Sequence, residues 1–151
     1  MSRENIINIM MIENDAAHTE IVGRKLKDFP VANRFFPVPD GRQALDILFR
    51  RGAGAGPDAV PHPDLIILDM CLPNMDGLEV LRTIKNDESL KQIPAIMLTT
   101  SEEAEDIQAA YVGGAGSYLI KPADFEKFDR MLDALCTYWL TWNRTSSRNG
   151  L

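Results

Sequence analysis

Side chains that can do phosphoryl or metal chemistry recur along this chain, each directly after a short apolar segment. They are Glu13, Asn14 and Asp15 after residues 6–12, Asp69 after residues 65–68, Thr99 after residues 95–98, and Lys121 after residues 117–120. A carboxylate can act as a nucleophile or bind a hard divalent cation, and a lysine and a hydroxyl can pair with phosphoryl oxygens. Each residue alone has an ordinary explanation, such as a helix cap, a turn or a solvated charge. Their recurrence after successive apolar segments favours one shared site.

The elements that must position these residues alternate between short apolar runs and longer segments with helical periodicity. Strands are predicted at residues 6–12, 33–38, 65–68, 95–98 and 117–120, and helices at residues 16–29, 41–51, 77–86, 102–112 and 123–142. This alternation implies a parallel sheet with helices on both faces, and the wholly apolar run at residues 65–68 indicates a central strand. Right-handed crossovers favour a flavodoxin-like α/β fold with five strands in the order 2-1-3-4-5. In that fold, ligands bind at the carboxyl ends of the strands.

Composition excludes several classes of function. The 151 residues suit one domain, and the formal net charge of −6 argues against a nucleic-acid binder, which needs a basic face. The apolar run at residues 6–12 contains Asn8 and is too short for a signal peptide or a membrane span. Cys71 and Cys136 lack metal-binding spacing and are interpreted as reduced thiols. We therefore expect a cytoplasmic protein that does not associate with membranes.

The segment LDMCLPNMDG at residues 68–77 resembles the phosphorylation-site segment of response-regulator receiver domains. Thr99 and the pair Lys121-Pro122 resemble that family's signalling hydroxyl and lysine, and Tyr118 matches its aromatic switch position. The resemblance covers residues 6 to about 140. It implies the receiver fold and a two-component response regulator without an output domain. Such a protein accepts a phosphoryl group from a sensor histidine kinase, here on Asp69.

The resemblance also implies a role for each site residue. Lys121 and Thr99 would pair with phosphoryl oxygens, and Mg²⁺ would be held by Glu13, Asn14, Asp69 and the backbone carbonyl of Cys71. Phosphorylation would draw Thr99 toward the phosphoryl group and let the Tyr118 ring move inward, changing the surface of residues 102–112, 117–120 and the last helix. The protein would promote its own phosphorylation and dephosphorylation without being an enzyme on a separate substrate.

One residue departs from the family pattern. Receiver domains usually carry two acidic residues after the first strand, and without a gap Glu13 takes the first of these positions and Asn14 the second. Asp15 lies one place late, where it can cap the first helix. Loss of one negative charge should weaken Mg²⁺ binding about tenfold or more. The alternative function is therefore a phosphorylation-defective receiver that acts as a phosphate-independent binding or dimerisation module.

The last helix carries more apolar side chains than one sheet face requires. The stripe consists of Phe125, Phe128, Leu132, Leu135, Trp139 and Trp142, widened by Met131, Tyr138 and Leu140. One interpretation is a broad core contact with a loose amphipathic end. The other is a self-association surface, for which the predicted residues are Tyr118, Met131, Tyr138, Trp139 and Trp142.

The long loop at residues 52–63 and the aromatic cluster at residues 138–140 are similar to a subgroup of single-domain regulators. That subgroup works with phytochrome-type histidine kinases of bacteria and cyanobacteria and commonly dimerises, so the resemblance implies a homodimer. We predict a receiver domain at residues 1–142 and a flexible tail at residues 143–151, with no room for a DNA-binding output domain.

Rival functions find little support in the sequence. A phosphatase that uses an aspartate after a strand needs a second aspartate two residues on, where this chain has Cys71. The glycines at residues 52–56 follow a helix instead of a strand, so they do not form a dinucleotide-binding turn. His18 and His62 are isolated in the sequence and are interpreted as surface residues.

Overall fold

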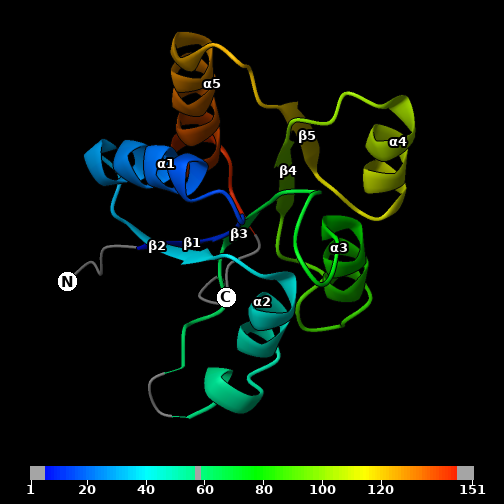
Figure 1. Ribbon diagram of the computed structural model, residues 1–151. Helices are drawn as coiled ribbons and strands as arrows, with labels where there is room; N and C mark the ends of the chain where they lie inside the picture. Colours follow the sequence, from blue (N-terminus) through cyan, green and yellow to red (C-terminus); the bar gives the residue numbers. More distant parts are fainter. Residues whose placement is uncertain (1–5, 57–58, 146–151) are drawn as a thin grey trace, which may run out of the picture.

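The computed structural model describes residues 6–56 and 59–145, and it contains one five-stranded sheet (Figure 1). The strands are β1 (Ile7–Ile12), β2 (Asn33–Val38), β3 (Leu65–Leu68), β4 (Ala95–Thr99) and β5 (Ser117–Ile120). Neighbouring strands are parallel, in the order β2-β1-β3-β4-β5. The predicted flavodoxin-like topology is therefore confirmed.

In the part of the chain that the structure describes, five α-helices connect and cover the strands. They are α1 (Ala16–Asp28), α2 (Gly41–Leu48), α3 (Gly77–Lys85), α4 (Ala104–Val112) and α5 (Phe125–Cys136). Four of them begin after an aspartate whose side chain accepts hydrogen bonds from backbone N–H groups of the first turn: Asp15, Asp40, Asp76 and Asp124. These caps satisfy donors that have no partner inside the helix, so each helix starts at a defined residue.

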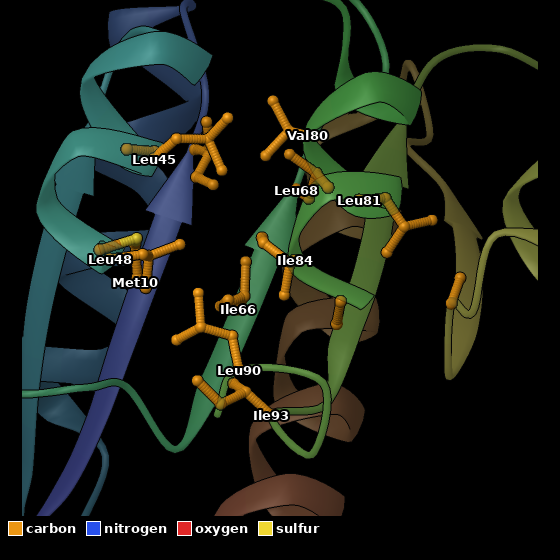
Figure 2. Packing of buried hydrophobic residues seen from close by; sticks show 14 of the residues in the cluster. Met10, Leu45, Leu48, Ile66, Leu68, Val80, Leu81, Ile84, Leu90 and Ile93 are labelled. Carbon is orange, nitrogen blue, oxygen red and sulfur yellow. The ribbon is translucent and has the colours of Figure 1, made fainter. Parts of the chain in front are cut away.

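The helices form two layers on opposite faces of the sheet (Figure 1). Side chains alternate along each strand, so Met10 and Ile12 face the cluster under α2 and α3, whereas Ile9 and Met11 face the cluster under α1 and α5. Figure 2 shows the first cluster, in which Leu45 and Leu48 of α2 and Val80, Leu81 and Ile84 of α3 meet strand residues such as Ile66 and Leu68. The three central strands, β1, β3 and β4, are almost wholly buried between these two apolar layers, which fix the strand ends in space.

Several predicted boundaries are wrong, each for a local reason. α2 ends at Leu48 before the left-handed backbone of Arg50 (φ 54°). α4 begins at Ala104 and not at residue 102, because Glu103 stays extended and its N–H donates to Ser101 Oγ (3.3 Å). α5 begins at Phe125 because Asp124 caps it.

The end of the last helix and the loop after α2 also differ from the prediction. Residues Thr137–Trp142 form a π-helix (η2) in place of a continued α-helix, and the predicted loop at residues 52–63 contains a short 3₁₀ helix (η1), Gly52–Gly54. Most of the predicted tail, residues 146–151, lies outside the described residues. Within residues 6–56 and 59–145, no helix has the length and apolar character needed to cross a membrane.

Candidate functional site

Glu13 lies directly after β1 and is almost completely buried, with 4% of its surface exposed. Its backbone N–H donates to the Val38 carbonyl (3.0 Å), which continues the pairing of β1 with β2. Its carboxylate accepts a hydrogen bond from the Asp15 N–H at Oε2 (3.1 Å) and another from Lys121 Nζ at Oε1. Glu13 is therefore held at the carboxyl edge of the sheet and turned toward the end of β5.

Asp69 lies directly after β3 and is 8% exposed. Its backbone N–H donates to the Ile12 carbonyl (3.0 Å), which places it beside Glu13. Asp69 Oδ1 accepts a hydrogen bond from the Cys71 N–H (3.2 Å), and Oδ2 accepts one from Lys121 Nζ (3.3 Å). These two contacts orient the carboxylate at the sheet edge.

Lys121 lies directly after β5, and its backbone N–H donates to the Thr99 carbonyl at the end of β4 (2.7 Å). Only 3% of its side chain is exposed. The ammonium contacts both carboxylates and also lies 2.9 Å from His18 Nδ1. The structure thus brings the predicted residues Glu13, Asp69 and Lys121 together in one buried cluster.

The two carboxylates in this cluster share one ammonium, and this imbalance shows in their pKa values. Burial, reinforced by the nearby Asp69, raises the pKa of Glu13 to about 7. Burial also acts to raise the pKa of Asp69, but the hydrogen bonding of Glu13 and the positive charge of Lys121 outweigh it and lower the pKa of Asp69 below its ordinary value. Asp69 is therefore the group that stays ionised, while Glu13 is the one that holds a proton most readily.

Thr99 and Tyr118 occupy neighbouring strands beside this cluster. Thr99 is completely buried, and its Oγ1 has no hydrogen-bond partner among the described residues, although the hydroxyl favours the ionised form of Asp69. Tyr118 is partly buried against the cluster under α2 and α3, and its hydroxyl donates to the Ser101 carbonyl (2.9 Å). Ser101 Oγ in turn donates to Asp106 Oδ2 in α4 (2.5 Å). A chain of contacts therefore runs from β5 through the loop after β4 to α4.

The other two residues predicted to bind Mg²⁺ lie at the surface of the cluster. Asn14 and Cys71 are exposed. Asp15 caps α1, as expected: its Oδ1 accepts hydrogen bonds from the N–H groups of Ala17 (2.9 Å) and His18 (3.2 Å). Because the Asp15 carboxylate is engaged in capping α1, it does not take the place of the acidic side chain that position 14 lacks.

The prediction that both histidines are isolated surface residues is wrong. His18 is half-buried and contacts Lys121, and His62 is half-buried with Nε2 3.1 Å from the Leu48 carbonyl. The sequence offered one signal for His18. His18 lies in the first turn of the helix after β1, and this turn begins beside the carboxyl edge of the sheet, where Lys121 is also predicted to lie.

The structure divides the residues predicted for self-association. Met131 and Trp139 are partly buried and pack against the cluster under α1 and α5, as in the broad-core interpretation. Tyr138 and Trp142 are 52% and 73% exposed. Tyr118 packs on the other side of the sheet. Only the outer face of η2 therefore presents large unburied aromatic side chains from this set.

The buried Thr99 hydroxyl leads to a prediction about stability. Replacing Thr99 with Val keeps the shape of the side chain and removes a hydroxyl that, among the described residues, has no partner within hydrogen-bond distance and only a weaker stabilising effect on ionised Asp69. We expect the free energy of unfolding of Thr99→Val to be unchanged or higher by up to about 1 kcal/mol, because an unpaired buried polar group costs free energy. Urea unfolding of the native chain, Thr99→Val and the hydroxyl-retaining Thr99→Ser measures this. A loss above about 1 kcal/mol in Thr99→Val alone would show that the hydroxyl is paired.

The fold and the site together define the class of protein. A parallel sheet of order 2-1-3-4-5 with an acidic residue after β1, an aspartate after β3 and a lysine after β5 is the arrangement of a receiver domain. The family model for the response regulator receiver domain matches residues 9–133, and the chain belongs to this family.

Named relatives agree with this assignment. The probable methanogenesis regulatory protein FilR2 of Methanothrix harundinacea is 37% identical over 96% of this chain and 91% of its own length. The response regulator Rcp1 of Synechocystis is 33% identical over 87% of this chain and 88% of its own length. The crystal structure of the Mn²⁺-bound form of response regulator Rcp1 is 30% identical with a TM-score of 0.89, covering 93% of this chain and 99% of that chain. The phosphorylated cyanobacterial phytochrome response regulator RcpA is 31% identical with a TM-score of 0.88, covering 95% of this chain and 100% of RcpA.

The donor set at the sheet edge suits a hard divalent cation. Within residues 6–56 and 59–145, no three His, Cys, Asp or Glu side chains are grouped so as to hold a metal. Mg²⁺ does not need such a group, because it keeps several waters and binds proteins through one or two carboxylates. Glu13 and Asp69 supply two carboxylates that share one ammonium, and the resulting surplus of negative charge is what a cation relieves. The residues present therefore fit Mg²⁺.

Proposed function

We propose that this chain is a response regulator that accepts a phosphoryl group from a histidine kinase on Asp69. The observation that carries the proposal is the contact of Lys121 Nζ with Asp69 Oδ2 (3.3 Å) at the buried carboxyl edge of the sheet. An ionised aspartate is a nucleophile, and a fixed ammonium beside it can pair with an oxygen of the incoming phosphoryl group. Phosphoryl transfer depends mainly on such positioning and electrostatics.

Each residue has a distinct part in the proposed reaction. Asp69 Oδ attacks phosphorus, a bond forms between the two, and the bond from phosphorus to the donor nitrogen breaks. Lys121 neutralises charge on a phosphoryl oxygen, and the unpaired Thr99 hydroxyl donates a hydrogen bond to another. The protein thereby promotes its own phosphorylation and dephosphorylation without turning over a separate substrate.

A Mg²⁺ ion in this proposal is held by Glu13, Asp69, the Asn14 side-chain oxygen and the backbone carbonyl of Cys71. Bound there, it supplies positive charge that offsets the repulsion between Asp69 and the phosphoryl oxygens. Glu13 faces Lys121, and Asn14 brings a neutral amide where family members usually have a carboxylate. Affinity for Mg²⁺ is therefore expected to be weak.

A carboxylate introduced at position 14 tests whether the neutral Asn14 weakens Mg²⁺ binding. We expect Asn14→Asp to bind Mg²⁺ about tenfold or more tightly than the native chain, because a carboxylate replaces a neutral oxygen ligand. Isothermal titration calorimetry of both proteins measures the change. Gln92→Glu is the matched control, since it adds the same charge on an exposed residue shortly before β4, at the opposite edge of the sheet. Equal affinity in the native chain and Asn14→Asp would remove position 14 from the ligand set.

The proposed output is a change in α4, β5 and α5. If Thr99 moves toward the phosphoryl group, the packing beside Tyr118 changes, and Tyr118 is tied through Ser101 to Asp106 of α4. A charge added at Asp69 would thus reach the surface of α4 through a movement of Thr99 and then through the hydrogen bonds of Tyr118 and Ser101. Fluorescence or NMR of Tyr118 with and without phosphorylation tests this route, and an unchanged Tyr118 signal would exclude it.

Intact-protein mass spectrometry after incubation with acetyl phosphate tests the central proposal. We expect the native chain to gain one phosphoryl mass in the presence of Mg²⁺ and none after chelation, and Asp69→Asn to gain none in either condition. If the native chain gains nothing even at high Mg²⁺ and with a kinase present, the alternative applies. The chain would then be a phosphate-independent binding or dimerisation module, for which the neutral Asn14 is the supporting observation.

The proposed partner is a sensor histidine kinase in the cytoplasm, of the phytochrome class. Solved relatives such as RcpA are phytochrome response regulators, which supports this choice. FilR2, which is also similar along nearly the whole chain, carries a name linked to methanogenesis and not to light. Phosphoryl transfer from a purified phytochrome kinase, compared with a kinase of another input class, distinguishes the two. In this proposal residues 1–142 form the receiver and residues 143–151 a tail.

A homodimer through the outer face of η2 is the proposed working form. Tyr138 and Trp142 are its exposed aromatic residues, and such residues are common at interface centres. We expect the native chain to dimerise and the variant Tyr138→Ser/Trp142→Ser to be monomeric, because the apolar area of both rings is lost. Size-exclusion chromatography with light scattering measures the mass of each. Phe125→Ser is the control, since Phe125 is 61% exposed at the opposite end of α5. A native monomer, or a dimer that survives the double substitution, would exclude this surface.

A further inference from the structure

His18 is held in place from three sides. It stands in the first turn of α1, and its backbone N–H donates to the capping carboxylate of Asp15 (3.2 Å). Its ring lies edge-on to the Phe128 ring of α5, with centroids 5.8 Å apart and planes at 87°. Its Nδ1 lies 2.9 Å from Lys121 Nζ, and 29% of its side chain is exposed. Packing and capping therefore fix the direction in which Nδ1 points.

The contact with Lys121 determines which ring nitrogen carries the hydrogen. An ammonium has three donors and no acceptor, so His18 Nδ1 must accept the hydrogen bond and Nε2 must carry the N–H. Asp15 Oδ2 is 3.6 Å from Nδ1, beyond hydrogen-bond distance, and as a carboxylate oxygen it has no hydrogen to donate to Nδ1. The acceptor at Nδ1 is thus dedicated to Lys121.

His18 completes the coordination of the Lys121 ammonium. Its three hydrogen-bond acceptors are Glu13 Oε1, Asp69 Oδ2 and His18 Nδ1, from the ends of β1 and β3 and the start of α1. With only 3% of the Lys121 side chain exposed, water has little access to replace a lost acceptor. Removing His18 Nδ1 would leave one ammonium N–H unpaired and free the ammonium to shift.

We infer that His18 is a positioning residue for phosphoryl transfer, holding the Lys121 ammonium at Asp69 as its third acceptor. This inference rests on the proposed phosphorylation of Asp69. During transfer the N–H that points to Asp69 Oδ2 passes to a phosphoryl oxygen. Glu13 and His18 keep the other two, so the ammonium stays in place while its third partner changes.

Two variants separate the acceptor from the bulk of the ring. His18→Asn places an amide oxygen close to the position of Nδ1, whereas His18→Leu fills a similar volume and has no acceptor. At saturating Mg²⁺ and fixed acetyl phosphate, we expect His18→Leu to phosphorylate about 10- to 150-fold more slowly than the native chain, the range expected for loss of one hydrogen bond to a charged group. His18→Asn should stay within about threefold of the native rate. A purely structural role for the ring would slow both variants alike.

A second measurement does not need phosphorylation. We expect ¹⁵N NMR of the native chain to show His18 in the neutral form with hydrogen on Nε2 and an accepting Nδ1. Hydrogen on Nδ1, a His18→Leu rate within twofold of the native rate, or equal slowing in both variants would overturn the inference. A native chain that takes no phosphoryl group at all would instead overturn the proposed function, and the positioning role with it.

Discussion

Replacing Lys121 with Met is expected to slow phosphorylation of Asp69 by acetyl phosphate about 100-fold or more. Removal of one fixed group that stabilises developing charge typically costs that much in enzymes. The Lys121 ammonium is 3% exposed and contacts Asp69 Oδ2, so nothing in bulk solvent takes its place. Rates are measured by intact mass at saturating Mg²⁺.

The same substitution has an opposite effect on the metal. Lys121→Met removes a positive charge beside Glu13 and Asp69, so Mg²⁺ affinity should stay equal or rise, which calorimetry measures. Lys121→Arg is the control, because it keeps the charge while changing the geometry, and it should fall between the native chain and Lys121→Met. A Lys121→Met rate within threefold of the native rate would show that the lysine is not part of the transfer.

Replacing Gly77 with Ala is expected to lower the free energy of unfolding by about 3 kcal/mol, at the upper end of what overpacking usually costs. A Cβ at position 77 would lie 2.0 Å from the Asp69 carbonyl oxygen and 2.8 Å from Met70 Cα. Both atoms belong to the backbone that carries the proposed phosphoacceptor, so relief requires the start of α3 or Asp69 itself to move. Thermal unfolding should fall by about 6–12 °C.

Gly116→Ala is the matched control for this prediction. A Cβ there meets only the Ala95 carbonyl oxygen, at 3.6 Å, which is an ordinary van der Waals contact. Its stability should stay within about 1 kcal/mol of the native chain. If Gly77→Ala and Gly116→Ala unfold at the same temperature, the close approach of α3 to Asp69 is not a constraint on the fold.

Much of the site was predictable because the strand order shows which residues, distant in the sequence, lie close together in the fold. Apolar runs mark β1, β3, β4 and β5, and parallel pairing places the residues after them at one edge. This pairing brings Glu13, Asp69 and Lys121 to the same edge, where their side chains meet. The cap role of Asp15 follows from its type and its place before a helix.

The contacts of the site that could not be predicted are those that depend on the direction in which a side chain points. His18 is one polar residue in the first turn of a helix, and the sequence does not reveal the packing of its ring on Phe128, which helps to turn Nδ1 toward Lys121. The contact between Tyr118 and the Ser101 carbonyl joins β5 to the loop after β4, whose shape the sequence leaves open.

The aromatic end of the last helix shows a related limit. Spacings of three and four fit an α-helix, but residues Thr137–Trp142 adopt the wider π-helix. That change in pitch alters which side chains reach the core. Leu140 is buried and Trp139 partly so, while Tyr138 and Trp142 remain exposed. A periodicity count based on one helix type cannot make this division.

The position of the phosphoryl group in the phosphorylated chain shows whether Asp69 is the phosphoacceptor. After incubation with acetyl phosphate and Mg²⁺, borohydride reduction and tandem mass spectrometry identify the modified residue. We predict modification of Asp69 alone. A phosphoryl group found on another residue, or a native chain that remains unmodified at high Mg²⁺ with a kinase donor present, would contradict it.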